Sequence, residues 1–219
     1  ALEKVGAKAK RIAAQLLGAS HEDMALESGP FVVAGTDKKL GWHEVCLAAY
    51  TGHNLPSGME PGLKEGAFYD PTNFTFPAGT YVCEVEVDPE TGMVEIVQFV
   101  AADDFGRIIN PMIVEGQVHG GIAQGIGQAM MEGAVYSSDG QLLTASYMDY
   151  QMRRAGDLPS FTVSTHETIC PGTRLGMTGC GEAGAIGSPP AFVNALTDAL
   201  GKEIAMPATP QRVWAALRG

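Results

Sequence analysis

The chain has 219 residues, 45% of them hydrophobic, so it can bury a core as one large domain or as two small lobes. Fourteen Lys and Arg stand against 25 Asp and Glu, and the formal charge of −11 argues against nonspecific binding to nucleic acid or to an anionic membrane. The sequence contains no run of 18 apolar residues and no signal-peptide pattern, so we expect no membrane insertion and a cytoplasmic location.

The first 70 residues predict helices and short strands. Apolar residues recur at helical spacing between Lys and Arg, which predicts a helix that Gly18 ends. A later stretch rich in Gly and Pro predicts an irregular loop. The predicted segments are a helix over 2–17, strands over 24–26 and 31–33, a helix over 42–50 and the loop over 51–71.

Strands dominate the next part of the chain. Alternating apolar residues on both sides of the turn at 88–92 predict a β-hairpin of 81–87 with 93–100. Further strands are predicted at 143–150 and 161–168. With the helices, this mixture predicts an α+β fold of mixed, largely antiparallel sheets packed with helices. Lobes over 1–72 and 73–219 are one way to divide it.

A glycine-rich helix is predicted over 111–132. Asn110 is placed to cap it, Pro111 suits its first turn, and an apolar stripe follows. Five interior glycines cost such a helix on the order of 4 to 5 kcal/mol relative to Ala, so we expect close approach of another backbone or of a flat ligand to offset them. Four residues share a face at helical spacing: Gln117, Gly121, Gln124 and Gln128.

The most informative segment is 179–190, which places Glu182 among four glycines. Ser188 is predicted to cap the following helix, with Pro189 at its first position and Gly201 at its end. Glu182 is thus predicted on a loop beside a helix start. A carboxylate held there and shielded from solvent can act as a base near neutral pH, whereas most such Glu residues are solvated surface groups. Local chemistry leaves both interpretations open.

The segment beginning at 179 resembles the GxGExGxxGxPxAxxNAxxDA signature of the large subunit of molybdenum hydroxylases, the family of xanthine dehydrogenase, aldehyde oxidoreductase and aerobic carbon monoxide dehydrogenase. Asn194 and Asp198 complete it. Residues 104–129 resemble the family's NPxxxxGQxxGGxxQGxG segment, and 207–217 resemble its tail. Residues 60–63 and 69–77 are similar to the carbon monoxide dehydrogenase branch.

The resemblance implies a site. Glu182 takes the role of the base next to the molybdenum, and no residue of this chain binds the metal directly. Residues beside the pterin and the metal's oxo group come from the glycine-rich helix and the glycine run. By the resemblance, the cofactor-binding residues are Gln117, Gly120, Gly121, Gln124, Gly179, Cys180 and Gly181.

The resemblance also implies a reaction and partners. The parent enzyme is expected to oxidise a small substrate, such as carbon monoxide, an aldehyde or an N-heterocycle, with water-derived oxygen at a molybdenum–molybdopterin cytosine dinucleotide centre. Expected partners are the rest of the large subunit, a medium FAD subunit, a small iron–sulfur subunit and a second copy of the assembly. Because the chain opens in mid-helix without Met, we expect a C-terminal fragment that is inactive alone and binds the cofactor weakly or not at all. Copper would require upstream residues.

The cysteines and histidines predict no metal site, and two other functions are possible for this chain. The four cysteines are far apart in the sequence, so we expect no zinc or iron–sulfur site in this chain: Cys46, Cys83, Cys170 and Cys180. Cys180 is expected to be a buried, inert thiol. His119, near the expected site, is expected to pack rather than to bind a metal. A noncatalytic scaffold or subunit-interaction module is the main alternative. A third function, an unrelated nucleotide-binding protein with a glycine loop before a helix, is disfavoured because this chain lacks the strand–loop–helix with a Lys or a ribose-binding acid at the expected spacing.

Overall fold

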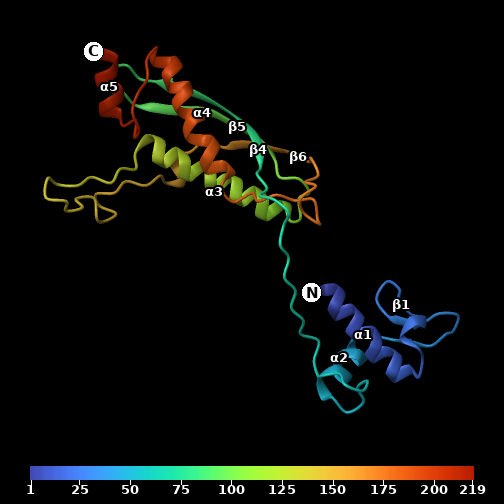
Figure 1. The fold of residues 1–219 in the computed structure, drawn as a ribbon. Coiled ribbons are helices and arrows are strands. Elements are labelled where there is room, and N and C mark those ends of the chain that lie inside the picture. The colour runs from blue at the N-terminus through green and yellow to red at the C-terminus, as the bar shows by residue number, and fades with distance from the viewer. The chain divides into compact units, whose positions relative to one another are not determined.

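The computed structural model describes residues 1–219, which divide into two compact units, Ala1–Asp70 and Pro71–Gly219. Figure 1 traces the helices and strands of both units. Each unit has a hydrophobic core of its own, built from residues of that unit alone.

In the first unit, two helices pack with a small antiparallel sheet of order β1-β2-β3. Helix α1 buries Ala9, Ile12 and Ala13, and it ends at Gly18, whose φ of 61° is the left-handed conformation that glycine adopts without a steric penalty. The helices, the two longer strands and the irregular segment after α2 are confirmed. The bounds are α1 Leu2–Leu17, η1 His21–Asp23, β1 Met24–Leu26, β2 Phe31–Val33, β3 Lys39–Leu40 and α2 Trp42–Thr51.

The second unit is built on a three-stranded sheet of order β4-β5-β6. Strands β4 (Ala78–Val87) and β5 (Val94–Asp104) form the predicted hairpin, which is longer at both outer ends than the sequence indicates. Strand β6 (Phe161–His166) is also confirmed, but it pairs with β5 in parallel. The predicted α+β class with mixed sheets is confirmed.

Two helices cover one face of this sheet. Helix α3 spans Pro111–Met130, helix α4 spans Ala183–Leu200, and they lie side by side against β4, β5 and β6 (Figure 1). Asn110 caps α3 as predicted, because its side-chain oxygen accepts a hydrogen bond from the N–H of Ile113. The shared core includes Phe99, Phe105, Val118, Ile122, Ile126, Phe192, Leu196 and Val213. The short elements are η2 Ala155–Asp157 and α5 Pro210–Arg218.

Helices α3 and α4 touch backbone to backbone. A Cβ added to Gly121 would lie 2.9 Å from the Cα of Gly184, and one added to Gly184 would lie 2.6 Å from the carbonyl oxygen of Val118. One turn further on, a Cβ on Gly125 would overlap the hydroxyl of Ser188. The expected close approach of another backbone is therefore confirmed for Gly121, whereas Gly125 meets the side chains of Ser188 and Pro189. The contacts advance in the same direction along both helices, from Gly121 with Gly184 to Gly125 with Ser188, so α3 and α4 run parallel here.

Helix α4 begins six residues earlier than the sequence predicts. Ser188 is not its cap: this residue is buried inside the helix, and its hydroxyl donates to the carbonyl oxygen of Gly184 at 2.7 Å. Pro189 and Pro190 lie in the interior, where their missing N–H groups leave two carbonyls of the preceding turn without helical donors. The contact of Gly184 with α3 explains why the helix extends past its prolines. Glu182 lies in the turn directly before the helix, as its N-cap, so its predicted position beside a helix start is confirmed although the helix begins earlier.

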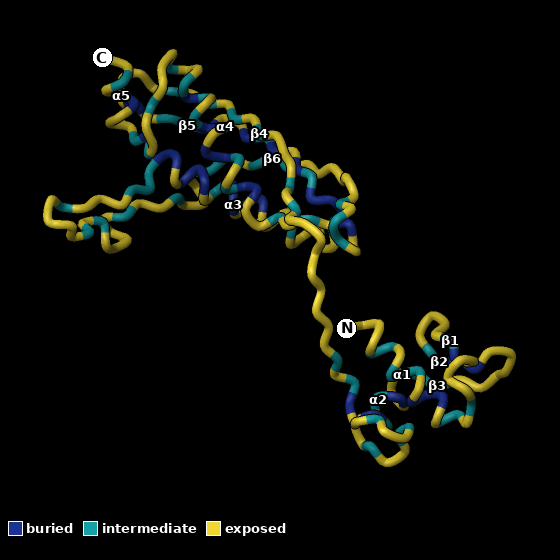
Figure 2. The backbone as a smooth tube through the Cα atoms, viewed as in Figure 1, coloured by how far each residue is buried: buried dark blue, intermediate teal, exposed yellow.

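The predicted strand over 143–150 is also wrong. Residues 131–160 form a long excursion between α3 and β6, most of it exposed (Figure 2). Ser146 starts a local turn in which its carbonyl accepts from the N–H groups of Asp149 and Tyr150 and its hydroxyl bonds the Asp149 carboxylate. Side-chain bonds of this kind compete with sheet pairing. Apolar side chains of this segment consequently stay exposed, Tyr147 at 84% and Met148 at 96%.

Candidate functional site

The structure brings part of the predicted site together where α3 meets the start of α4. Gly121 is buried against the first turn of α4. Gly181 lies next to Gln117, because a Cβ on Gly181 would be 3.7 Å from the Oε1 atom of that side chain. Gln117 is therefore a near neighbour of the residue that precedes Glu182.

Glu182 is the residue from which α4 starts. Its carbonyl oxygen accepts the first helical hydrogen bond, from the N–H of Ile186 at 3.0 Å, and its side chain makes no capping bond. The side chain is exposed in residues 1–219, whereas we expect a shielded carboxylate from the sequence. That shielding is not supplied by this chain, and the catalytic assignment of Glu182 stays a prediction.

The remaining predicted residues fall into two groups. Gly120 and Gly179 are exposed and have no atom within 4 Å of where a Cβ would stand, so a flat ligand has room to approach the backbone at both. Gln124 is exposed on the same face of α3 as Gln117, about 10 Å further along the helix. Cys180 is half-buried and packs against the core.

The first turn of α4 adds hydrogen-bond donors to this locality. In an α-helix the leading N–H groups have no acceptor within the helix, and the helix dipole favours negative charge beside them. The N–H groups in question follow Glu182, at Ala183, Gly184 and Ala185. Exposed Gln amides, open glycine backbone and helical N–H donors together fit an oxygen- and nitrogen-rich ligand such as a pterin.

A tyrosine on the sheet supports α4 from beneath. A Cβ on Gly187 would stand 2.6 Å from the ring of Tyr81, so the helix rests directly on that ring. The Tyr81 hydroxyl donates to the carboxylate of Asp103, at 2.8 Å to Oδ1 and 3.0 Å to Oδ2. Asp103 is 2% exposed and has no cation beside it. The support of α4 thus includes a buried carboxylate.

The pKa values of Asp103 and its neighbour Asp104 are shifted in opposite directions. Burial raises the pKa of Asp103, and the hydrogen bond from Tyr81 lowers it by less. Burial, together with the bond to Asp103, raises the pKa of Tyr81. The pKa of Asp104 falls to about 2, because this carboxylate accepts hydrogen bonds from Thr168 and from the N–H of Gly106. Period-two alternation with Phe99 places Asp103 on the inner face, and this was the signal that could have identified it from the sequence.

We expect Asp103→Asn and Asp104→Asn to change the pH dependence of stability with opposite signs. Because the pKa of Asp103 is raised in the folded chain, ionisation of this residue lowers the free energy of unfolding as the pH rises through the folded pKa. The stability that Asp103→Asn gains over the native chain is therefore largest at neutral pH. A lowered pKa means that Asp104 contributes stability above its ordinary value of 3.8, lost as pH falls toward 2, so Asp104→Asn loses most at neutral pH.

Urea unfolding at pH 3 and pH 7 measures this difference. Trp214 reports on residues 71–219 when Trp42, the other tryptophan, is replaced by Phe. The same sign of pH dependence for both substitutions would contradict the assignment of the two environments.

His119 lies against the sheet. Its ring meets that of Phe161 edge to face at a centroid distance of 5.6 Å, which is the packing role expected from the sequence. Among residues 1–219, no group of three or more His, Cys, Asp and Glu side chains is arranged to hold a metal ion. None of the helices is both long and apolar enough to cross a bilayer.

Comparison with known proteins gives one family. A family model described as a molybdopterin cofactor-binding domain matches residues 1–159. The carbon monoxide dehydrogenase large chain of Hydrogenophaga pseudoflava is 38% identical over 223 residues, an alignment that covers 100% of this chain and 28% of that one. The nicotine 6-hydroxylase large subunit of Paenarthrobacter nicotinovorans is 38% identical over 214 residues, covering 95% of this chain and 26% of that subunit.

A solved structure agrees with these relatives. A crystal structure of the Cu,Mo-CO dehydrogenase in its carbon monoxide reduced state superposes with a TM-score of 0.84 at 36% identity, covering 99% of this chain and 28% of that one. The chain spans less than a third of the length of each of these proteins.

Proposed function

The chain belongs to the molybdopterin cofactor-binding domain family, and from that premise we propose that it is part of the large subunit of a molybdenum hydroxylase in which Glu182 is the base. The observation that carries the proposal is the juxtaposition of Gln117 with the Gly181–Glu182 backbone at the start of α4. The substrate we propose is a small molecule, such as carbon monoxide, an aldehyde or an N-heterocycle. Relatives named for carbon monoxide and for nicotine support that class.

When bound, a molybdenum–pterin group supplies the redox chemistry of such a hydroxylation. The residues of this chain bind and orient that group. The amides of Gln117 and Gln124 can both donate to and accept from a pterin edge, and Gly120 and Gly179 leave room for it against the backbone. The Glu182 carboxylate accepts a proton from water at the reacting centre. Its position is fixed because it begins a helix that contacts both α3 and Tyr81.

The dinucleotide form of the cofactor and the partners belong to the same proposal. We propose molybdopterin cytosine dinucleotide, a medium FAD subunit, a small iron–sulfur subunit and a dimer of the assembly, because these accompany the family that the motifs resemble. The relatives are named as large chains or large subunits, which supports an assembly of several subunits. Copper depends on residues outside this chain.

Co-expression of this chain with the large-subunit segment encoded next to it tests the proposal. The assembled subunit is expected to retain molybdenum through gel filtration, and Gln117→Ala is expected to lower its affinity for the cofactor by about 10-fold to 100-fold. Gln98→Ala is the matched control, because Gln98 is exposed on β5, outside the site. Metal analysis of the purified assemblies measures the loss.

An assembly that forms but never carries molybdenum would show that the chain is a noncatalytic interaction module. Equal molybdenum content in Gln117→Ala and Gln98→Ala would remove Gln117 from the cofactor site.

A further inference from the structure

The sheet of the second unit has an unpaired edge at β6. Strand β5 lies in the centre, and β4 and β6 each form an edge. Residues 161–166 pair with β5 in parallel register, from Phe99 opposite Phe161 to Asp104 opposite His166. Within residues 1–219, no backbone hydrogen bond joins β6 to any segment other than β5. Alternate N–H and C=O groups of β6 therefore face outward without partners.

The two edges of the sheet differ in how they resist pairing with another strand. Strand β4 has a register shift between Glu84 and Val85, and it exposes Glu84 and Glu86. Bulges and charged side chains are devices that keep edge strands unpaired. Strand β6 has neither, since its sequence from Phe161 to His166 contains no Lys, Arg, Asp, Glu or Pro and its register with β5 is unbroken.

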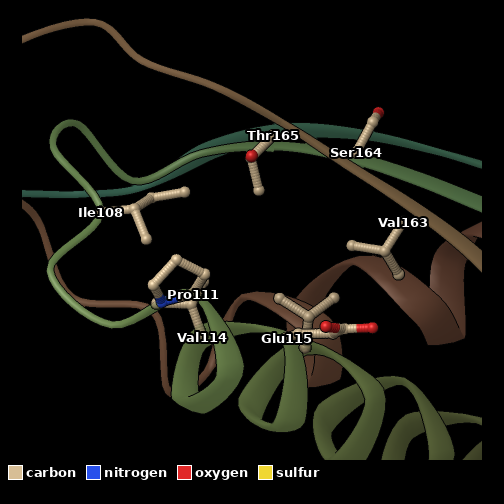
Figure 3. Close-up of a pocket in the computed structure, with 8 residues that line it drawn as sticks. Ile108, Pro111, Val114, Glu115, Val163, Ser164 and Thr165 are labelled. Carbon is tan, nitrogen blue, oxygen red and sulfur yellow. The ribbon is translucent and has the colours of Figure 1, made fainter.

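A pocket of about 180 Å³ adjoins this edge. Figure 3 shows it between β6 and the first turns of α3, with Ile108 and Val114 as apolar walls and Val163 and Thr165 on the side of the strand. Glu115 is the one charged residue in its lining and makes no ion pair within residues 1–219. The pocket can therefore receive an aliphatic side chain, and its rim favours a positive charge.

Charge points to the same kind of occupant. Residues 71–219 contain seven Lys and Arg against 16 Asp and Glu, so this unit carries a formal charge of −9 out of −11. Next to the pocket, the Glu167 carboxylate accepts from the N–H of Ile108 at 3.1 Å. A segment that covers this edge gains from carrying Lys or Arg.

We propose that an extended strand from the part of the large subunit outside residues 1–219 adds to the free edge of β6, placing an aliphatic side chain in the pocket and a Lys or Arg beside Glu115. This inference rests on the proposed function, which supplies the occupant. The relatives are long enough to provide it, since this chain covers 28% of one and 26% of the other. Main-chain hydrogen bonds give such strand addition its affinity, and the pocket gives it specificity.

Amide hydrogen exchange on the free chain and on the assembly with the adjoining large-subunit segment tests this. Roughly half of the β6 amides, those facing outward, are expected to exchange at least about tenfold more slowly in the assembly. The outward amides of β4 serve as the internal control and are expected to change little. Molybdenum content is measured on the same assembly, so that the two proposals are judged separately.

A pair of charge reversals sharpens the test. Glu115→Lys is expected to weaken association of the two segments by about tenfold, whereas Glu95→Lys, the same change on an exposed residue of β5, leaves it unaltered. Assembly with molybdenum but without slower exchange in β6 would overturn the strand addition and leave the proposed function standing. Slower exchange in β6 without molybdenum would support the strand addition and count against the cofactor. Concentration-dependent protection of β6 in the free chain would identify a second copy as the occupant instead.

Discussion

In the assembled large subunit, Glu182→Gln is expected to lower kcat by a factor of about 10² to 10⁴ and to leave the molybdenum content unchanged. Gln keeps the size and hydrogen-bonding capacity of the side chain but cannot take up a proton near neutral pH. Because Glu182 caps α4 with its backbone and makes no capping bond with its side chain, the substitution leaves the helix start intact. The loss therefore reports on proton transfer and not on folding.

The control for this experiment is Glu203→Gln. Glu203 is exposed and follows the opposite end of α4, so it matches the chemistry of the change without touching the site. Steady-state turnover and metal analysis on the same preparations provide both readouts. If Glu182→Gln retained ordinary activity with normal molybdenum, Glu182 would not be the base.

Gly184→Ala is expected to lower the free energy of unfolding of residues 71–219 by up to about 2 kcal/mol. Alanine favours a helix by about 1 kcal/mol over glycine, but overpacking costs typically about 1 to 3 kcal/mol and occasionally more. Here the new Cβ would stand 2.6 Å from the carbonyl oxygen of Val118 and 2.7 Å from the N atom of Ile122. Both are backbone atoms of α3, which cannot rotate away, so the helices must separate.

The matched substitution is Gly116→Ala on α3. No atom lies within 4 Å of its Cβ position, and the residue is exposed, so helix propensity alone should raise stability by up to about 1 kcal/mol. Urea unfolding followed by Trp214 in the Trp42→Phe background compares the two. Equal effects of the two substitutions would mean that α3 and α4 are not in backbone contact.

Sequence patterns predicted those elements whose order is determined locally. Helix α1 and the β4–β5 hairpin carry both a clear apolar period and residues that end or turn the chain, Gly18 and the segment 88–92. Asn110 marked the start of α3 in the same way. The glycines of α3 also indicated the close approach of a backbone or of a flat ligand, although not which of the two.

Errors arose where distant contacts decide the conformation. Ser188 and Pro189 carry a strong local signal for a helix start, but the packing of Gly184 on α3 extends the helix past it. Over 143–150 the predicted strand does not form, because the segment has no partner strand and a turn begins at Ser146 instead. The parallel pairing of β6 and the burial of Asp103 depend on the same long-range arrangement.

The spacing of α3 and α4 is set by main-chain atoms, and side-chain volume has little influence on it. Sequence divergence elsewhere can consequently proceed without altering how far Gln117 stands from the start of α4, as long as the facing positions lack side chains. A TM-score of 0.84 at 36% identity is consistent with such tolerance. Under the proposed function, side chains around this contact can then change with the substrate while the distance between the two helices stays the same.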